Sequence, residues 1–142
     1  MNLTELLNKK VLVIDDDPAM TDILRLLLQT EVGLVITANS GVEGLELAHQ
    51  ESPDIIILDL MMPQMDGWEV CKLLREFSKV PIIILSALDN PAVVASALDS
   101  GADDYLIKPV TSNTLLLHIA NLLRRMQYQV GSVVKETIDK LV

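Results

Sequence analysis

Five polar side chains lie at or just beyond the ends of short apolar runs: Asp15, Asp16, Asp59, Ser86 and Lys108. If these runs are neighbouring parallel strands, their carboxyl ends meet at one edge of a sheet and the three carboxylates converge there. At about 5 Å separation and an effective dielectric near 20, each carboxylate pair repels by roughly 3 kcal/mol. Such a cluster is stable only if some groups are protonated or a cation lies between them.

Oxygen ligands at a shallow edge favour a hard divalent cation that keeps several waters, which indicates Mg²⁺, with Mn²⁺ as a substitute. Lys108 adds a mobile positive charge, and Ser86 adds a hydroxyl donor, on the other side of Asp59. This combination suits a phosphoryl group, because the cation and the lysine neutralise its oxygens while a carboxylate oxygen attacks phosphorus in line. The product is a mixed anhydride, a labile species that suits a temporary mark.

The elements that must position these residues alternate along the chain. Short aliphatic runs predict five strands, at residues 11–14, 35–37, 55–58, 82–85 and 105–107. Most of the runs are continuous rather than alternating, which is typical of buried parallel strands. Amphipathic stretches between them predict helices, two of which begin at Asp17-Pro18 and Asn90-Pro91. The alternation predicts an α/β fold: an open, doubly wound five-stranded parallel sheet of order 2-1-3-4-5, flavodoxin-like (βα)₅.

The last helical pattern is expected to end near Arg125. We therefore predict one domain over residues 9–125 and a C-terminal tail or linker helix over residues 126–142. Within this tail, apolar residues recur at helical spacing, interrupted only by Gly131. They are Val130, Val134, Ile138 and Leu141.

Composition limits the class of protein. The 142 residues carry 11 basic and 20 acidic side chains, a net charge of −9, which disfavours direct binding to nucleic acid or anionic membranes. A single cysteine, Cys71, excludes an internal disulfide framework and fits a reducing cytosol. The apolar runs are too short to span a membrane, and the N-terminus lacks a signal-peptide block. We expect a cytoplasmic protein.

Four segments of the chain carry a family resemblance: VLVIDDDP at 11–18, LDLMMPQMDG at 58–67, LSA at 85–87 and GADDYLIKP at 101–109. Together they resemble the receiver domain of two-component response regulators over about residues 9–125. The resemblance implies a phosphorelay in which Asp59 is the phosphoacceptor. Its phosphoryl group would come from a histidine kinase, a phosphotransfer protein or a small acyl phosphate.

The resemblance also implies roles for other residues. The Mg²⁺ ligands would be Asp15, Asp16, Asp59 and the backbone carbonyl of Met61. Lys108 would pair with the phosphoryl group, Ser86 would turn toward it, and Tyr105 would be an aromatic switch. The signal would reach the face formed by the fourth helix, fifth strand and fifth helix, and the Lys108-Pro109 bond is commonly cis in this family.

Two departures from common family patterns are informative. Thr114 and His118 stand where one subfamily has an acid and an arginine that pair across a dimer, and the neighbouring run 115–117 is apolar. This favours a hydrophobic homodimer contact on the same face over an ionic one. Met61 and Leu88 occupy positions whose side chains can orient a hydrolytic water. Both are apolar here, which predicts slow self-dephosphorylation.

Some polar residues are expected to have no chemistry. Asp17 is predicted to cap a helix, and Asp103 and Asp104 to form a solvated turn. Beyond assisting its own phosphoryl transfer, the chain is not expected to be an enzyme. The main alternative is a phosphate-independent interaction module with the same fold, which the retained acids, hydroxyl and lysine disfavour. A flavodoxin-like electron carrier or an Asp-x-Asp phosphohydrolase fits the strand-end residues less well.

Overall fold

Five parallel strands form the centre of the molecule. A computed structural model describes residues 3–141, with side chains at 5–127 and 134–141. The strands are β1 (Lys10–Ile14), β2 (Leu34–Ala38), β3 (Ile55–Leu58), β4 (Ile82–Ser86) and β5 (Asp104–Ile107). Their order is β2-β1-β3-β4-β5, which confirms the predicted topology. The central strands β3 and β4 are buried along their whole length, as their continuous apolar runs predicted.

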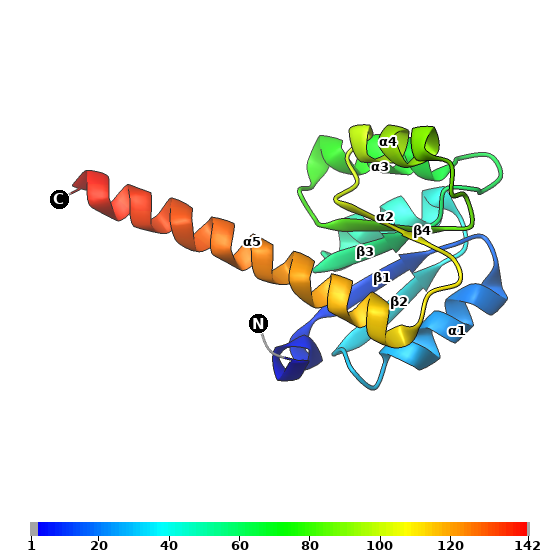
Figure 1. Cartoon of the computed structure of the whole chain (residues 1–142), viewed down its shortest axis with the longest axis horizontal. Helices are drawn as coiled ribbons and strands as arrows, with labels where there is room; N and C mark the ends of the chain where they lie inside the picture. The colour runs from blue at the N-terminus through cyan, green and yellow to red at the C-terminus, as the bar shows by residue number, and fades with distance from the viewer. Residues whose placement is uncertain (1–2, 142) are drawn as a thin grey trace.

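Helices cover both faces of this sheet (Figure 1). They are α1 (Pro18–Leu28), α2 (Gly41–Glu51), α3 (Gly67–Phe77), α4 (Pro91–Asp99) and α5 (Ser112–Leu141). Alternate residues of β1 and β3 enter two separate cores, because successive side chains of a strand point to opposite faces. One core contains residues of α1 and α5, and the other contains residues of α2, α3 and α4. A short 3₁₀ helix, η1 (Leu3–Asn8), was not predicted, and its Leu6 is fully buried in the first core.

The helix boundaries next to the strand ends follow local sequence signals. Asp17 caps α1, as predicted, with its Oδ1 accepting a hydrogen bond of 3.0 Å from the backbone N–H of Ala19. Asn90 caps α4 in the same way, through the N–H of Ala92 at 2.8 Å. Gly101 lies between α4 and β5 with φ of +118°, a conformation that strongly favours glycine. These caps set where each loop at the edge of the sheet begins and ends.

The last helix corrects one prediction. It does not end near Arg125 but continues to Leu141, so that its second half projects from the domain (Figure 1). Gly131 alone lowers helix stability by only about 1 kcal/mol, and no proline follows it. The tail residues Val134, Ile138 and Leu141 are exposed, whereas the side chain of Val130, and Val142 as a whole, lie outside the described residues.

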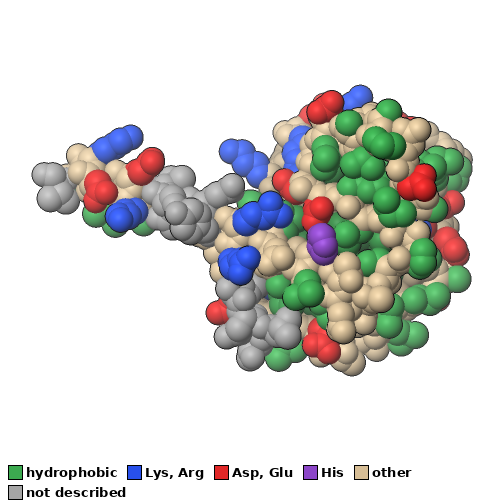
Figure 2. Space-filling model, in the orientation of Figure 1, with side chains coloured by type: hydrophobic (Ala, Val, Ile, Leu, Met, Phe, Trp, Pro, Cys, Tyr) green, Lys and Arg blue, Asp and Glu red, His purple; other side chains and the backbone are tan. Residues whose placement is uncertain are grey.

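The projecting end of α5 has a mixed surface. Figure 2 shows acidic and basic side chains over much of its visible surface, with apolar ones along one edge. Within the described residues, no helix combines the length and the apolar character that crossing a membrane requires, and this holds for α5 as well.

Candidate functional site

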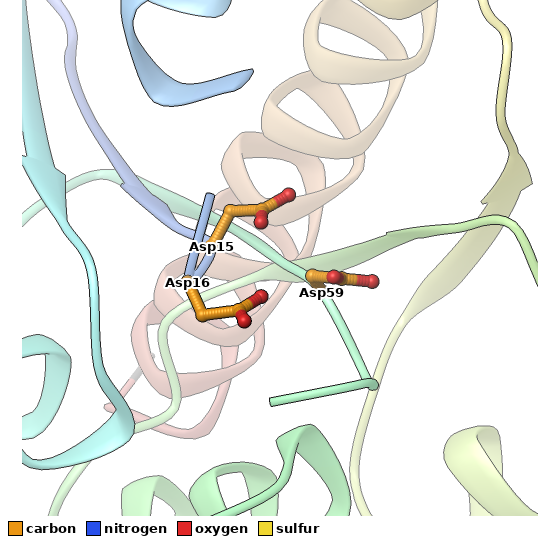
Figure 3. Close-up of side chains that lie close together, drawn as sticks. All are labelled: Asp15, Asp16 and Asp59. Atoms are coloured by element: carbon orange, nitrogen blue, oxygen red, sulfur yellow. The ribbon is translucent and has the colours of Figure 1, made fainter. Parts of the chain in front are cut away.

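Three carboxylates converge where β1 and β3 end. Ile14 and Leu58 are paired in register, so the residues that follow them leave the sheet side by side. Asp15, Asp16 and Asp59 each offer a carboxylate oxygen, and these oxygens all lie within 4.8 Å of one another. Figure 3 shows the three side chains grouped at the strand ends. The predicted convergence of these acids is therefore observed.

One ammonium group faces this acidic cluster. Lys108 follows β5, and its Nζ lies 2.9 Å from Oδ2 of Asp15 and 3.7 Å from Oδ2 of Asp59. The backbone N–H of Lys108 donates to the carbonyl of Ser86 at 2.8 Å, which fixes the lysine against the end of β4. The Lys108-Pro109 peptide bond is cis. Among the described residues, Lys108 is the one cation paired with these three carboxylates, and the cluster keeps a negative excess.

The electrostatics of Asp59 reflect this excess. Burial raises the pKa of the Asp59 carboxyl above its ordinary value, and the nearby charge of Asp15 raises it further. Lys108 and the backbone N–H groups of Leu60 and Met61 act in the opposite direction and lower this pKa. The Leu60 N–H lies 2.9 Å from Oδ1 of Asp59. Full ionisation of Asp59 is therefore favoured when a further cation lies close to it.

The donor set fits a hard metal ion. All three side chains offer carboxylate oxygens, the ligands that Mg²⁺, Mn²⁺ and Ca²⁺ prefer. Asp15 and Asp59 are buried while Asp16 is exposed, so an ion held here would keep part of its shell of water. The cluster is thus able to bind a metal ion on chemical grounds.

The loop after β3 is held close to α3. The N–H of Gly67 donates to the carbonyl of Leu60 at 2.9 Å, and Asp66 caps α3 by accepting from the N–H of Glu69 at 2.9 Å. A Cβ atom added at Gly67 would lie 2.3 Å from the backbone oxygen of Asp59. Only glycine allows this approach, so α3 directly supports the backbone of the candidate phosphoacceptor.

Ser86 and Tyr105 are connected through the loop after β4. Ser86 is fully buried, and its Oγ accepts a hydrogen bond of 3.3 Å from the N–H of Leu88. The hydroxyl of Tyr105 donates to the carbonyl of Leu88 at 2.7 Å. Burial raises the pKa of Tyr105, so its hydroxyl keeps its proton and remains a donor near neutral pH. The two residues predicted to form a switch therefore hold the same loop.

The prediction of a solvated turn at Asp103 and Asp104 was right only for Asp103, which is exposed at a bend before β5, and both side chains have partners far away in the chain. Asp103 Oδ2 accepts from the N–H of Ile82 and pairs with Arg75, each at 2.9 Å. Asp104 begins β5, and its Oδ2 lies 2.6 Å from Nδ1 of His118. These partners are distant in sequence, and no local pattern indicates them.

Comparisons with known proteins agree with this geometry. A family model described as the response regulator receiver domain matches residues 11–120. A probable transcriptional regulator, ycf27, of Guillardia theta is 45% identical over 82% of this chain and 46% of its own length. The alkaline phosphatase synthesis transcriptional regulatory protein PhoP of Bacillus subtilis is 40% identical over 85% of this chain and 51% of its own. The chain spans about half the length of these relatives.

Solved structures are similar over most of this chain. The receiver domain of the Francisella response regulator 1452 has 37% identity and a TM-score of 0.77, covering 84% of this chain and 99% of that one. A two-component response regulator from Clostridium difficile has 31% identity and a TM-score of 0.80, covering 84% and 98%. The matched residues include the acid cluster and its lysine. This chain therefore belongs to the receiver domain family of two-component response regulators.

Proposed function

We propose that Asp59 accepts a phosphoryl group while Mg²⁺ is bound by Asp15, Asp16, Asp59 and the backbone carbonyl of Met61. The observation that carries this proposal is the cluster of three carboxylates within 4.8 Å facing one ammonium. Oxygen-only ligands at a partly exposed edge favour Mg²⁺ over softer metals, with Mn²⁺ as a substitute. When bound, the ion supplies charge neutralisation for the carboxylates and for the incoming phosphoryl oxygens.

The transfer itself is carried out by residues of the chain. An oxygen of Asp59 forms a bond to phosphorus as the bond from phosphorus to the donor's imidazole or acyl oxygen breaks, and the bonding electrons leave with the donor. Lys108, already 3.7 Å from Asp59, moves its ammonium onto a phosphoryl oxygen. Ser86 donates its hydroxyl to another of these oxygens. The result is an acyl phosphate on Asp59.

Phosphorylation is proposed to bias the face formed by α4, β5 and α5. The phosphoryl group adds nearly two negative charges and three strong acceptors next to Ser86 and Lys108. Because Ser86 and Tyr105 both bond to Leu88, a shift of the serine hydroxyl changes the bonds that hold the loop after β4. Tyr105 then acts as the aromatic switch between the inactive and active arrangements.

The phosphoryl group is proposed to be long-lived. Met61 has 61% of its surface exposed, next to Asp59, and Leu88 lies in the loop after Ser86. Neither side chain has a strong hydrogen-bonding group that could align a water molecule with phosphorus. Self-dephosphorylation is therefore slow, although the chain assists it through the same metal and lysine.

The proposed partners follow from the same surfaces. A histidine kinase or phosphotransfer protein supplies the phosphoryl group, and a second copy of the chain contacts the α4–β5–α5 face. Exposed apolar side chains of α4 and β5, which include Leu98 and Ile107, favour an apolar contact. His118 pairs with Asp104 of its own chain and so is not free for an ionic contact across the dimer. The net charge of −9 disfavours direct contact with nucleic acid, and we assign the protein to the cytoplasm.

Residues 9–125 are proposed to be the receiver domain, and residues 126–142 a linker helix. The continuation of α5 to Leu141 supports this role, because an unbroken helix transmits a displacement of the domain to whatever its far end contacts.

Incubation with acetyl phosphate tests the proposed function. We expect one phosphoryl group per chain with Mg²⁺, none with EDTA and none in Asp59→Asn, measured by intact-mass spectrometry and a phosphate-dependent gel shift. No phosphorylation of the wild-type chain, by this donor or by a phosphorylated kinase, would instead favour a phosphate-independent interaction module.

A further inference from the structure

Asp16 is the least restrained of the three clustered acids. Asp15 accepts hydrogen bonds from Lys108 and from the N–H of Asp17, and Asp59 accepts from the N–H of Leu60. Among the described residues, by contrast, the carboxylate of Asp16 makes no hydrogen bond or ion pair and is exposed. Its position must therefore be set by the backbone of the loop after β1.

A single side chain holds that backbone from the neighbouring loop. The Nδ2 of Asn39 donates to the backbone carbonyl of Asp15 at 2.9 Å. This carbonyl belongs to the peptide that joins Asp15 to Asp16. The hydrogen bond from Asn39 therefore fixes the orientation of this peptide plane, and with it the position of the Asp16 Cα atom. The peptide before it is held as well, because the backbone N–H of Asp15 donates to the carbonyl of Ala38 at 3.1 Å.

Asn39 is itself restrained by two helices. Its Nδ2 also donates to Oγ1 of Thr21, at 3.1 Å, and the hydroxyl of Thr21 in turn donates to the carbonyl of Pro18 at 3.1 Å. Thr21 is buried in the first turns of α1. The backbone N–H of Asn39 donates to Oε2 of Glu43 in α2 at 3.1 Å. The side-chain amide of Asn39 therefore connects the acidic loop to α1, and the backbone N–H of the same residue connects it to α2.

We propose that Asn39 is a positioning residue for the metal site, acting through the Asp15–Asp16 peptide with Thr21 as its support. This inference rests on the proposed function, because it assumes that the acid cluster binds Mg²⁺. Without the amide, the peptide between the two acids rotates more freely and Asp16 must be ordered each time an ion binds. The cost falls on metal affinity, since partners of this kind that orient ligands typically change it by 10-fold or more.

The experiment is a Mg²⁺ titration without any phosphodonor. Trp68 reports on the site, because it lines a cavity of about 410 Å³ together with Leu60 and Met61, beside the Asp59 loop. For Asn39→Ala we expect an apparent Kd for Mg²⁺ about 10-fold higher than that of the wild-type chain. Thr21→Val keeps the bond from Asn39 to Asp15 but removes its support, and we expect a smaller increase, of roughly threefold. A second readout is the amide NMR signal of Asp16, which should shift in both variants before Mg²⁺ is added.

Ser40→Ala is the matched control. Ser40 caps α2 by accepting from the N–H of Glu43 at 3.1 Å, so the variant weakens the same helix start without touching Asp15. Thermal unfolding in EDTA verifies that each variant folds. If Asn39→Ala does not fold, Thr21→Val provides the test of the positioning role. Equal Mg²⁺ affinity in Asn39→Ala and wild type, or an equal loss in Ser40→Ala, would overturn the positioning role alone. Absence of saturable binding by the wild-type chain would overturn the proposed metal site and this inference together.

Discussion

Two carboxylate–cation pairs in this molecule have the same N–O distance but differ in the charge around them. Asp15 lies 2.9 Å from Lys108 at the acid cluster, and Asp103 lies 2.9 Å from Arg75, which belongs to α3. Arg75 also donates to the carbonyls of Gly101 and Val80, at 2.8 Å and 2.6 Å. The second pair is thus balanced in charge and its donors are used within the fold.

The acid cluster is unbalanced by comparison. Lys108 neutralises one charge, while Asp15, Asp16 and Asp59 together contribute three. The distance between a carboxylate and its cation therefore does not distinguish a pair that stabilises the fold from one that belongs to a binding site. The difference lies in the charge left over: a balanced pair stabilises the fold, whereas an excess of carboxylates creates a site for a further cation and for the chemistry that it supports.

The largest expected effect is the loss of phosphorylation in Asp59→Asn. The amide cannot act as the attacking oxygen, so we expect no phosphoryl transfer from acetyl phosphate within the sensitivity of intact-mass spectrometry. Arg75→Ala, assayed at a temperature where it is folded, should be phosphorylated at a rate close to that of the wild-type chain. A comparable loss in both variants would mean that the two regions are not functionally distinct.

The balanced pair should instead dominate stability. Arg75→Ala removes hydrogen bonds to two loops, at Val80 and at Gly101, and leaves Asp103 without its cation. We therefore expect the free energy of unfolding to fall by about 2–3 kcal/mol in urea titrations. Arg124 provides the control because, in the described part of the chain, its side chain hydrogen-bonds only to Asn121. Arg124→Ala should cost less than about 0.5 kcal/mol. Similar losses in the two variants would contradict the structural role of Arg75.

A third test concerns the apolar rim of the acid cluster. Replacing Met61 with Asn and Leu88 with Glu introduces groups that can hydrogen-bond a water and direct it at phosphorus. We expect the double variant to lose its phosphoryl group about tenfold faster than the wild-type chain, which is within the range of positioned general-base effects. The measurement is the decay of phosphoprotein after removal of the donor. If the double variant loses its phosphoryl group no faster than the wild-type chain, apolar side chains at positions 61 and 88 are not the reason for slow self-dephosphorylation.

The smallest effects concern stability without metal, and they should have opposite signs in the two regions. Asp59→Asn removes a buried charge from an acidic cluster and should raise the free energy of unfolding in EDTA at neutral pH by about 1 kcal/mol. Asp103→Asn weakens charge-assisted bonds to Arg75 and should lower it by about 2 kcal/mol. Urea unfolding of both variants measures this, and a loss of stability in both would contradict the charge argument.

The pH dependence of the Asp59 effect follows from its pKa. Burial holds the pKa of Asp59 in the folded state above its pKa in the unfolded chain. Between these two pKa values, the folded state therefore binds more protons than the unfolded state. Its contribution to the free energy of unfolding therefore falls as pH rises from the unfolded pKa through the folded one. The advantage of Asp59→Asn over wild type in EDTA should grow over that range and then become constant. An advantage that shrinks as pH rises would contradict the sign of the shift.

The sequence allowed the sheet and the candidate site to be predicted because both depend on local signals. Continuous apolar runs located the strands, and the one after Asp54, at Ile55–Leu58, was predicted to the residue. The order of a doubly wound sheet then brought together residues that end neighbouring strands, such as Asp15 and Asp59. The helix caps at Asp17 and Asn90 depend on adjacent residues only.

The features that were missed depend on partners far away in the chain. The pairing of Asp103 with Arg75 spans 28 residues, and Asn39 reaches the carbonyl of Asp15 across 24. No periodicity encodes such contacts, because they form only after the loops are packed. The length of α5 was underestimated for another reason: residues 126–142 were predicted to be a separate tail or linker helix, although no strong helix breaker separates them from the helix before them and Gly131 alone does not end it.

The most direct test of the central claim is a Mg²⁺ titration of the wild-type chain followed by amide NMR. If excess negative charge defines the site, saturable shifts should be confined to the surroundings of Asp15, Asp16, Asp59 and Lys108, with Trp68 emission changing in parallel. The signals of Arg75 and Asp103 should not move. Absence of saturable shifts at the acid cluster, or shifts of equal size at both regions, would contradict the account.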